Sequence, residues 1–291
     1  MLANSLIQGL SSILAVLMAF LGACFGSFAS LIIYRLPREQ SIVWPRSHCD
    51  SCQKPLLKRH NIPIFSWLIL RGRCFFCRAP LGQRSLIIEL IMGVCLLSLY
   101  LKMGLSIALV DKFSFFFLLV CLAYIDLDTF TLPLVILLSL MFLGLGFSLI
   151  YLAYPHLYVP LGKQIGVLKI MVFNETPKFS ISDRIFGSGF GFLFLSAVNI
   201  LATAIFRKMG RLSSAQWAMG WGDPLLVLAL GLFVGLSHLI LLLFLASLLG
   251  SLMGIASRPW SYDSGCGDEI AKGALPFGPF LALAAIYIYL A

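Results

Sequence analysis

The sequence predicts an all-α membrane protein with about eight transmembrane helices and one small hydrophilic domain. Of its 291 residues, 60% are hydrophobic and 11% are charged, whereas soluble domains carry roughly 25% charged residues. The apolar residues form long runs that one basic segment, 35–84, interrupts. Four of the eight cysteines lie in that segment as two CxxC pairs. These observations favour a polytopic protein with a small domain that contains a metal site.

The apolar runs place the expected spans. Residues up to Tyr34 contain no charged side chain, so they lack the positive start of a secretory signal peptide, and a retained span is expected at about 10–34. The charge-free run from Pro224 to Ser257 would measure about 50 Å as one helix, against a hydrocarbon core of about 30 Å. We therefore expect two short spans there, broken around Gly231 to His238. Further spans are predicted at about 85–101, 105–125, 132–153, 184–206 and 275–290.

The basic residues indicate the orientation in the membrane. Segment 35–84 holds ten Lys or Arg residues against two acids, and most of the other basic residues also lie beside apolar spans. By the positive-inside rule, 35–84 is expected in the cytoplasm, the amino terminus outside, and 154–182 as an external loop. The basic residues are therefore interpreted as topology signals rather than a surface for nucleic acid. The expected organisation is a first span at 1–34, a cytoplasmic domain at 35–84 and a membrane domain at 85–291.

The cysteine pairs predict a zinc site. Cys49 and Cys52 form one pair, and Cys74 and Cys77 form the other after 21 intervening residues. Two such turns complete a closed tetrahedral shell of four thiolates, which is typical of structural zinc. A segment of about 50 residues buries little apolar surface, so a metal would stabilise it. Unligated cysteines or a redox pair remain the alternative.

Two aspartates at the ends of apolar runs are candidate catalytic residues. Asp126 follows the third predicted span and Asp223 precedes the sixth, so both are expected at the cytoplasmic face. Two neighbouring carboxylates do not both ionise cheaply, so one keeps a proton while the other acts as a base. Such a pair can activate water against a peptide carbonyl and protonate the leaving nitrogen. The alternative is that they are helix caps or interfacial charges without mutual contact.

Two other acids leave alternatives open. Asp128 competes with Asp126, and because residues two apart on a helix point to different faces, only one of them is expected in the site. Spacing alone does not choose between them. Glu89 lies in the second span as a candidate functional carboxylate or as an interfacial acid paired with Arg84 or another basic residue.

Taken together, these motifs resemble the type IV prepilin peptidase family over nearly the whole chain. The resemblance rests on six segments in the family's order: Gly26-Ser27-Phe28 with Tyr34-Arg35-Leu36-Pro37; the cysteine pairs with Asn61-Ile62-Pro63, Ser66-Trp67-Leu68 and Arg71-Gly72-Arg73; Arg84 with Glu89; Ile125-Asp126; Gly220-Trp221-Gly222-Asp223; and Pro276-Phe277-Gly278-Pro279-Phe280.

The resemblance implies an aspartic endopeptidase of the GxGD type in the bacterial inner membrane, with Asp126 and Asp223 as the catalytic dyad and Asp128 as a neighbour. The implied substrates are prepilins or pseudopilins, cut after the glycine that ends a short basic leader. The new amino terminus would be methylated from S-adenosylmethionine, an activity associated with the cytoplasmic zinc domain. No Gly-rich cofactor fingerprint is present there, so no residues are assigned to that cofactor, and no oligomeric state is indicated.

The sequence departs from the family pattern at Ser30, Leu134 and Leu225, where asparagine, aspartate and lysine are usual, and the loop at 154–182 is longer. Two other functions remain. One is a peptidase without methyl transfer. The other is a transporter that uses intramembrane carboxylates, which the position of the acids at span ends and the lack of a repeat disfavour.

Overall fold

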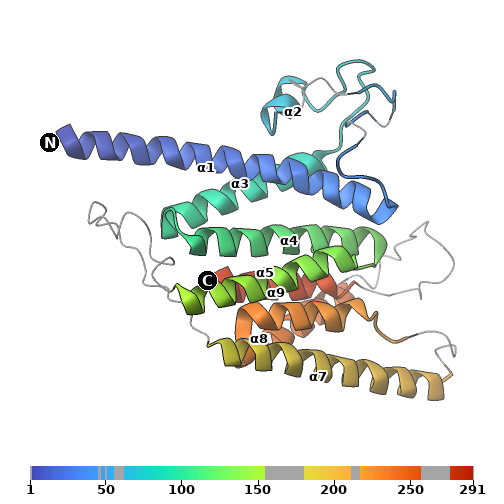
Figure 1. The fold of residues 1–291 in the computed structure, drawn as a ribbon. Coiled ribbons are helices and arrows are strands. Elements are labelled where there is room, and N and C mark those ends of the chain that lie inside the picture. The colour runs from blue at the N-terminus through green and yellow to red at the C-terminus, as the bar shows by residue number, and fades with distance from the viewer. Residues whose placement is uncertain are drawn as a thin grey trace. The chain divides into compact units, whose positions relative to one another are not determined.

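The computed structural model describes residues 2–44, 47–49, 51–55, 62–154, 180–210, 217–256 and 276–290, and helices dominate these ranges (Figure 1). Six described helices are long and apolar enough to cross a membrane, and α9 is a shorter apolar helix. The predicted all-helical membrane fold is therefore confirmed. The elements are α1 (Leu2–Arg35), the 3-10 turn η1 (Leu36–Arg38), α2 (Phe65–Ile69), α3 (Gln83–Met103), α4 (Ile107–Thr129), α5 (Leu134–Ala153), α7 (Ile181–Lys208), α8 (Gly222–Ala256) and α9 (Gly278–Leu290).

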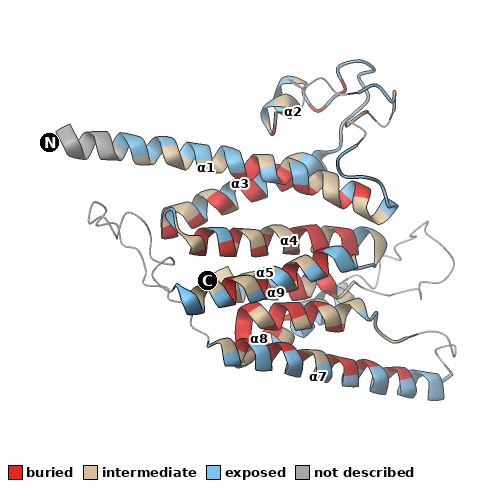
Figure 2. Ribbon diagram, in the orientation of Figure 1, coloured by how far each residue is buried: buried red, intermediate tan, exposed pale blue. Residues whose placement is uncertain are grey.

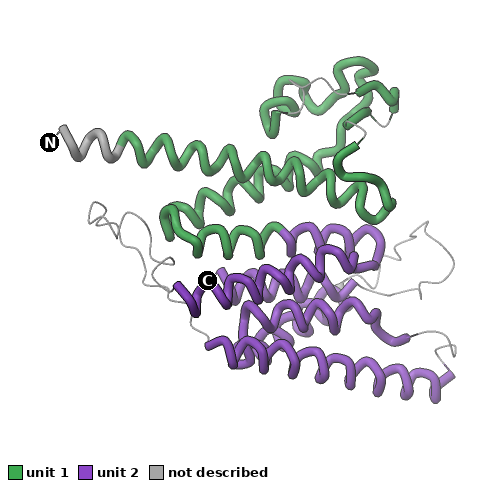
Figure 3. Tube along the Cα trace, in the orientation of Figure 1, with its two compact units in different colours: residues 1–117, 155–176 green, residues 118–154, 177–291 purple. Residues whose placement is uncertain are grey.

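The described residues form two compact units (Figure 3). The first contains residues up to 117 and the second those from 118 onward, so that the boundary falls inside α4. The predicted external loop at 154–182 lies mostly outside the described residues. Each unit has its own packing, and both candidate aspartates belong to the second.

In the first unit, small residues let α1 and α3 pack backbone to backbone. A Cβ at Gly22 would lie 2.5 Å from the Met92 carbonyl oxygen, and one at Gly26 would lie 2.5 Å from the Glu89 Cα. On the facing helix, a Cβ at Gly93 would lie 3.0 Å from the Ala19 oxygen. Small residues spaced by four are the usual means of close helix contact in membranes, where the hydrophobic effect does not drive helices together.

In the second unit, α8 reverses direction at Gly235. This residue has φ 73° and ψ 170°, a conformation that is essentially restricted to glycine. A Cβ at Gly191 of α7 would meet both Val227, before the break, and Leu239, after it. The two arms of α8 therefore lie against the same part of α7. The predicted break around Gly231 to His238 is confirmed, and Gly235 is the residue that makes it.

Two neighbouring charged residues of α7 lie at this break. Arg184, 3% exposed, donates from Nη1 to the Ser148 hydroxyl at 2.9 Å and to the Leu232 carbonyl at 3.4 Å. Asp183 accepts a 3.0 Å hydrogen bond from the Ser237 hydroxyl, at the start of the second arm. Carbonyls at a helix end have no partner within the helix, and a cation there is favourable, as an acid is at a helix start. Arg184 therefore binds a carbonyl at the end of the first arm, and Asp183 binds a side chain at the start of the second.

The buried residues of α7 follow one side of the helix, and its other side is exposed (Figure 2). That exposed side carries large apolar side chains such as Phe186, Leu193 and Leu201. In a membrane these side chains would contact lipid, so their exposure agrees with the transmembrane assignment. Phe233 of α8 is fully buried and packs edge-on against Tyr289 of α9, with ring centroids 5.5 Å apart.

Candidate active site

Asp126 lies within the last turn of α4 and is 5% exposed. Its Oδ2 accepts a 3.1 Å hydrogen bond from the backbone N–H of Gly278, the first residue of α9. The approach is close, because a Cβ at Gly278 would lie 2.6 Å from that same oxygen. Only glycine leaves room for the carboxylate in this position.

Asp223 lies in the first turn of α8 and is half-buried. The preceding residues form a tight turn, in which the Asp223 N–H donates to the Gly220 carbonyl at 3.4 Å. Gly222 lies against Leu132, since a Cβ there would be 3.0 Å from the Leu132 Cβ. The glycines of this motif therefore allow a turn that brings the start of α8 against the segment after α4.

The two carboxylates face one site. Asp223 is within electrostatic range of Asp126, although 97 positions separate them in the sequence. All the residues that position them belong to the second unit. The sequence left open whether these two aspartates lie near each other. The structure brings them together, because the end of α4 and the starts of α8 and α9 meet.

Asp128 is exposed, whereas Asp126 is buried. The two residues are on α4 at a spacing that turns them to different faces, as expected. The choice that spacing alone did not make follows from burial: the side chain next to Asp223 and Gly278 is that of Asp126.

Sequence reasoning missed the residues that hold this site. The motif Pro276-Phe277-Gly278-Pro279-Phe280 was recognised in the sequence, but nothing there indicated that the Gly278 N–H binds Asp126. Asn199 and Thr203 of α7 accept hydrogen bonds from the segment before Asp223, and the signal for them was two polar residues four apart in an apolar run.

The first unit gathers the four predicted metal-binding cysteines. The Sγ atoms of Cys49, Cys52, Cys74 and Cys77 all lie within 4.8 Å of one another, and those of Cys49 and Cys77 are 3.8 Å apart. A tetrahedral zinc with bonds of about 2.3 Å requires sulfur atoms about 3.8 Å apart. The arrangement of the four sulfur atoms therefore suits a metal ion.

The two CxxC turns have the same backbone design. In the first, the Gln53 N–H donates to the Cys49 carbonyl, and in the second, the Arg78 N–H donates to the Cys74 carbonyl. Gln53 and Arg78 both have positive φ, at 56° and 60°. In the second turn, the backbone N–H groups of Cys77 and Phe76 lower the pKa of the Cys74 thiol to about 6. The pKa of the Cys77 thiol is raised to about 11, despite the Ala79 N–H, by burial and by the neighbouring thiols. A lowered pKa favours the thiolate, which is the form that binds metal.

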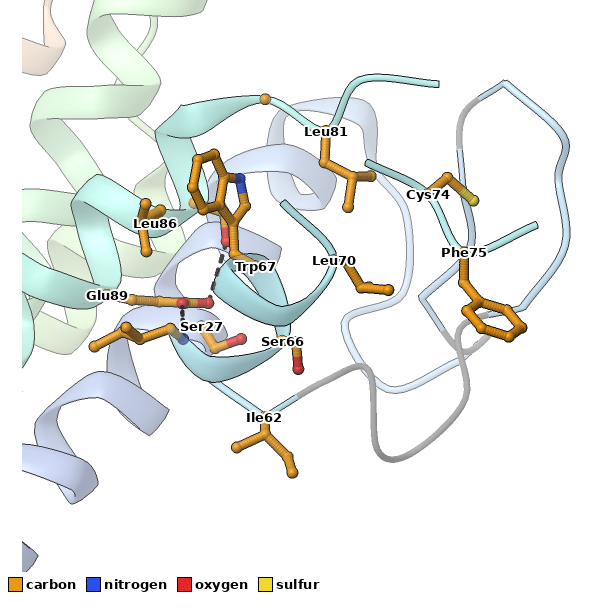
Figure 4. Close-up of a pocket in the computed structure, with 13 residues that line it drawn as sticks. Ser27, Ile62, Ser66, Trp67, Leu70, Cys74, Phe75, Leu81, Leu86 and Glu89 are labelled. Carbon is orange, nitrogen blue, oxygen red and sulfur yellow. Dashed lines mark hydrogen bonds between the residues drawn. The ribbon is translucent and has the colours of Figure 1, made fainter. Parts of the chain in front are cut away.

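Glu89 of α3 attaches this small domain to the spans. It is 6% exposed, and its Oε2 accepts a 2.7 Å hydrogen bond from the Ile64 N–H at the start of α2, while the Ser85 hydroxyl donates to Oε1 at 3.2 Å (Figure 4). The carboxylate thus binds a backbone N–H and a hydroxyl. The alternative of an interfacial acid paired with a basic residue stays a prediction. Ile64 itself has φ 64°, so this anchor holds a strained turn.

Two cavities of the first unit share Ser27 and Ser85, and Glu89 lines one of them. The first, of about 220 Å³, extends under α2, where Trp67 and Glu89 line it (Figure 4). The second, of about 490 Å³, has polar walls that include Ser30, Tyr34, Arg35 and His48. The buried Nε1 of Trp67 has no hydrogen-bond acceptor among the described residues.

The structure describes the surroundings of the three residues that depart from the family pattern. The Ser30 hydroxyl donates to the Gly26 carbonyl at 3.1 Å and lines the larger cavity. Leu134 is the exposed first residue of α5, where an aspartate would interact favourably with the helix dipole. Leu225 is half-buried in the first turn of α8, two residues after Asp223.

The fold and site define a class: an all-helical membrane protein with a four-cysteine cluster and two aspartates, one buried and one half-buried, that face each other at helix ends. Residues 20–103 match the model of the bacterial peptidase A24 N-terminal domain, and residues 113–255 match that of the type IV leader peptidase family. The chain belongs to this family of type IV leader peptidases, and the resemblance seen in the sequence is confirmed.

Curated relatives match most of the chain. A protein of Neisseria gonorrhoeae named prepilin leader peptidase/N-methyltransferase is 30% identical over 97% of this chain and 92% of its own length. One of Myxococcus xanthus with the same name is 33% identical over 83% of this chain, and the match spans 62% of that relative. An Escherichia coli protein named type 4 prepilin-like proteins leader peptide-processing enzyme is 27% identical over 91% of this chain and 89% of its own length. No solved structure matches the chain.

Proposed function

We propose that this chain removes the short basic leader of prepilins or pseudopilins, with Asp126 and Asp223 as its catalytic dyad. The observation that carries the proposal is that the two aspartates lie close together in the second unit. Asp126 is held by the Gly278 N–H and lies within electrostatic range of Asp223. The relatives' names point to the same substrates.

The chemistry follows from a shared proton. Of two carboxylates at close range, one holds a proton and the other is ionised. The ionised member takes a proton from water as the water attacks the peptide carbonyl, and the protonated member donates to the leaving nitrogen. Gly278 contributes by holding one Asp126 oxygen, which leaves the other free for the water or for Asp223.

The cut is proposed at the cytoplasmic face of a bacterial inner membrane, after the glycine that ends the leader. Segment 35–84, with its ten basic residues, would lie in the cytoplasm, and the amino terminus outside. The basic residues of the leader would keep it in the cytoplasm, by the same positive-inside rule that applies to basic loops. The apolar helix of the substrate would then enter the membrane beside the dyad.

The test is cleavage of a co-expressed prepilin by three single variants. Asp126→Ala and Asp223→Ala should abolish leader removal, while Asp128→Ala, the matched control two residues away, should retain it. Protease accessibility of the membrane fraction checks that all three insert alike. Cleavage by a correctly inserted Asp126→Ala or Asp223→Ala variant would contradict the assignment.

The first unit is proposed to carry methyl transfer to the new amino terminus. S-Adenosylmethionine would supply the methyl group, and the two cavities that share Ser27 and Ser85 are the proposed place for it. Supporting this, the Trp67 Nε1 donor beside them has no acceptor among the described residues, and a buried donor without a partner is costly. Mass spectrometry of the processed substrate tests it, because a methylated amino terminus is heavier by about 14 Da. An unmodified terminus would identify a peptidase without methyltransferase activity.

Zinc is proposed as a structural ion in 35–84, bound by Cys49, Cys52, Cys74 and Cys77. A shell of four thiolates leaves no open position for water, so no step of either reaction is assigned to the metal. Residues 85–291 are proposed to act as the peptidase domain, and 1–34 as the first span.

A further inference from the structure

Three residues on one side of α7 contact the segment that leads into Asp223. Asn199, Thr203 and Arg207 are spaced by four, so they lie one above the other on the helix. The segment is 217–222, which ends where α8 begins.

Two of these contacts are hydrogen bonds to successive backbone N–H groups. The Ala218 N–H donates to Thr203 Oγ1 at 2.9 Å, and the Met219 N–H donates to Asn199 Oδ1 at 3.1 Å. Asn199 is 1% exposed and Thr203 is 2% exposed, so no water competes for these bonds. They fix the backbone at Ala218 and Met219, which precede Asp223 by five and four residues.

The third contact is aromatic. The Arg207 guanidinium lies over the Trp217 ring, 5.5 Å from its centroid, and Trp217 packs edge-on against Trp221 at 5.1 Å. Trp221 lies two residues before Asp223. Residues 217, 218 and 219 thus contact α7 directly, and Trp221 packs on Trp217 within the segment.

Packing alone does not account for Asn199. Its Nδ2 is buried and has no hydrogen-bond partner among the described residues, and a buried donor without a partner is destabilising. Its Oδ1 accepts from the Met219 N–H at 3.1 Å and from the Thr203 hydroxyl at 3.5 Å, so the two polar residues are also joined to each other.

We propose that Asn199 and Thr203 are positioning residues, which set the distance between the Asp223 and Asp126 carboxylates by holding the Ala218 and Met219 N–H groups. Because Asp126 is fixed separately by Gly278, a shift of the 217–222 segment changes the geometry of the pair. This role rests on the proposed function. Misplacing a catalytic group by about 1 Å can lower the rate about a hundredfold.

The experiment measures prepilin cleavage by purified full-length variants. Thr203→Val keeps the shape of the side chain and removes the hydroxyl, and Thr203→Ser keeps the hydroxyl. Asn199→Leu removes the Oδ1 acceptor. Thr203→Val and Asn199→Leu should lower kcat about ten- to a hundredfold with KM nearly unchanged, and Thr203→Ser should restore most of kcat.

Ser188→Ala is the matched control. Ser188 is also on α7, and its hydroxyl donates to the Leu228 carbonyl of α8 at 2.7 Å, away from the 217–222 segment. This variant should change thermal unfolding in detergent as much as Thr203→Val does, yet keep its kcat. If Thr203→Val and Ser188→Ala lower kcat equally, or if Thr203→Val leaves kcat unchanged in an active enzyme, the positioning role is wrong. A wild-type protein that cleaves no prepilin would instead contradict the proposed function.

Discussion

The backbone N–H of Gly278 donates a 3.1 Å hydrogen bond to Asp126 Oδ2, across 152 positions of sequence. This contact joins the start of α9 to the last turn of α4. It leaves no space for a side chain, since a Cβ on Gly278 would approach the same oxygen to 2.6 Å. The position of the Asp126 carboxylate therefore depends on a glycine at position 278.

Gly278→Ala should lower prepilin cleavage about a hundredfold, because the added methyl group displaces the Asp126 carboxylate. Initial rates of leader removal measure the effect. Gly146→Ala in α5 is the control, since its Cβ would meet nothing within 4 Å. Equal rates for the two variants would show that the contact does not position Asp126.

Gly235→Ala should lower the thermal unfolding temperature in detergent. An alanine at φ 73° and ψ 170° is strained by about 1–3 kcal/mol, which weakens the reversal between the two arms of α8. Gly189→Ala is the comparison, because Gly189 is inside α7 with open space around it and alanine favours helix. An unchanged unfolding temperature for Gly235→Ala would contradict the assigned reversal.

Purified protein should contain about one zinc ion per chain, as expected for a single four-thiolate site. Cys49→Ser and Cys74→Ser should each remove most of it, because a hydroxyl replaces one thiolate of the shell. Elemental analysis measures the metal. Cys95→Ala, which changes a cysteine of α3 outside the cluster, should keep the full content. Retention of zinc by both serine variants would exclude the site.

Glu89→Leu should loosen α2, because the Ile64 N–H loses a buried charged acceptor, a loss of about 1.5–3 kcal/mol. The rate of trypsin cleavage at the exposed Arg71 and Arg73 reports this loosening. Glu89→Gln keeps an oxygen acceptor and should be cleaved at a rate closer to that of the wild type. Identical rates for Leu and Gln variants would mean that the Glu89 contact does not hold the domain.

The sequence by itself determined the features that depend on local chemistry. Apolar runs predicted the spans, because a charge-free helix of sufficient length is stable only in hydrocarbon. The break in α8 was expected from its excess length, and the CxxC spacing predicted a cluster of four thiols because each pair forms its turn within a few residues. Both aspartates were found as charges at the ends of apolar runs.

Only the tertiary structure decided which groups meet. Asp126 rather than Asp128 faces the site because α4 turns that side toward Gly278, and helix rotation depends on packing against other helices rather than on spacing. Similarly, Glu89, Asn199 and Thr203 each accept a hydrogen bond from a backbone N–H, a group that every residue except proline carries. Backbone donors leave no mark in a sequence, so their partners become visible only when the chain is folded.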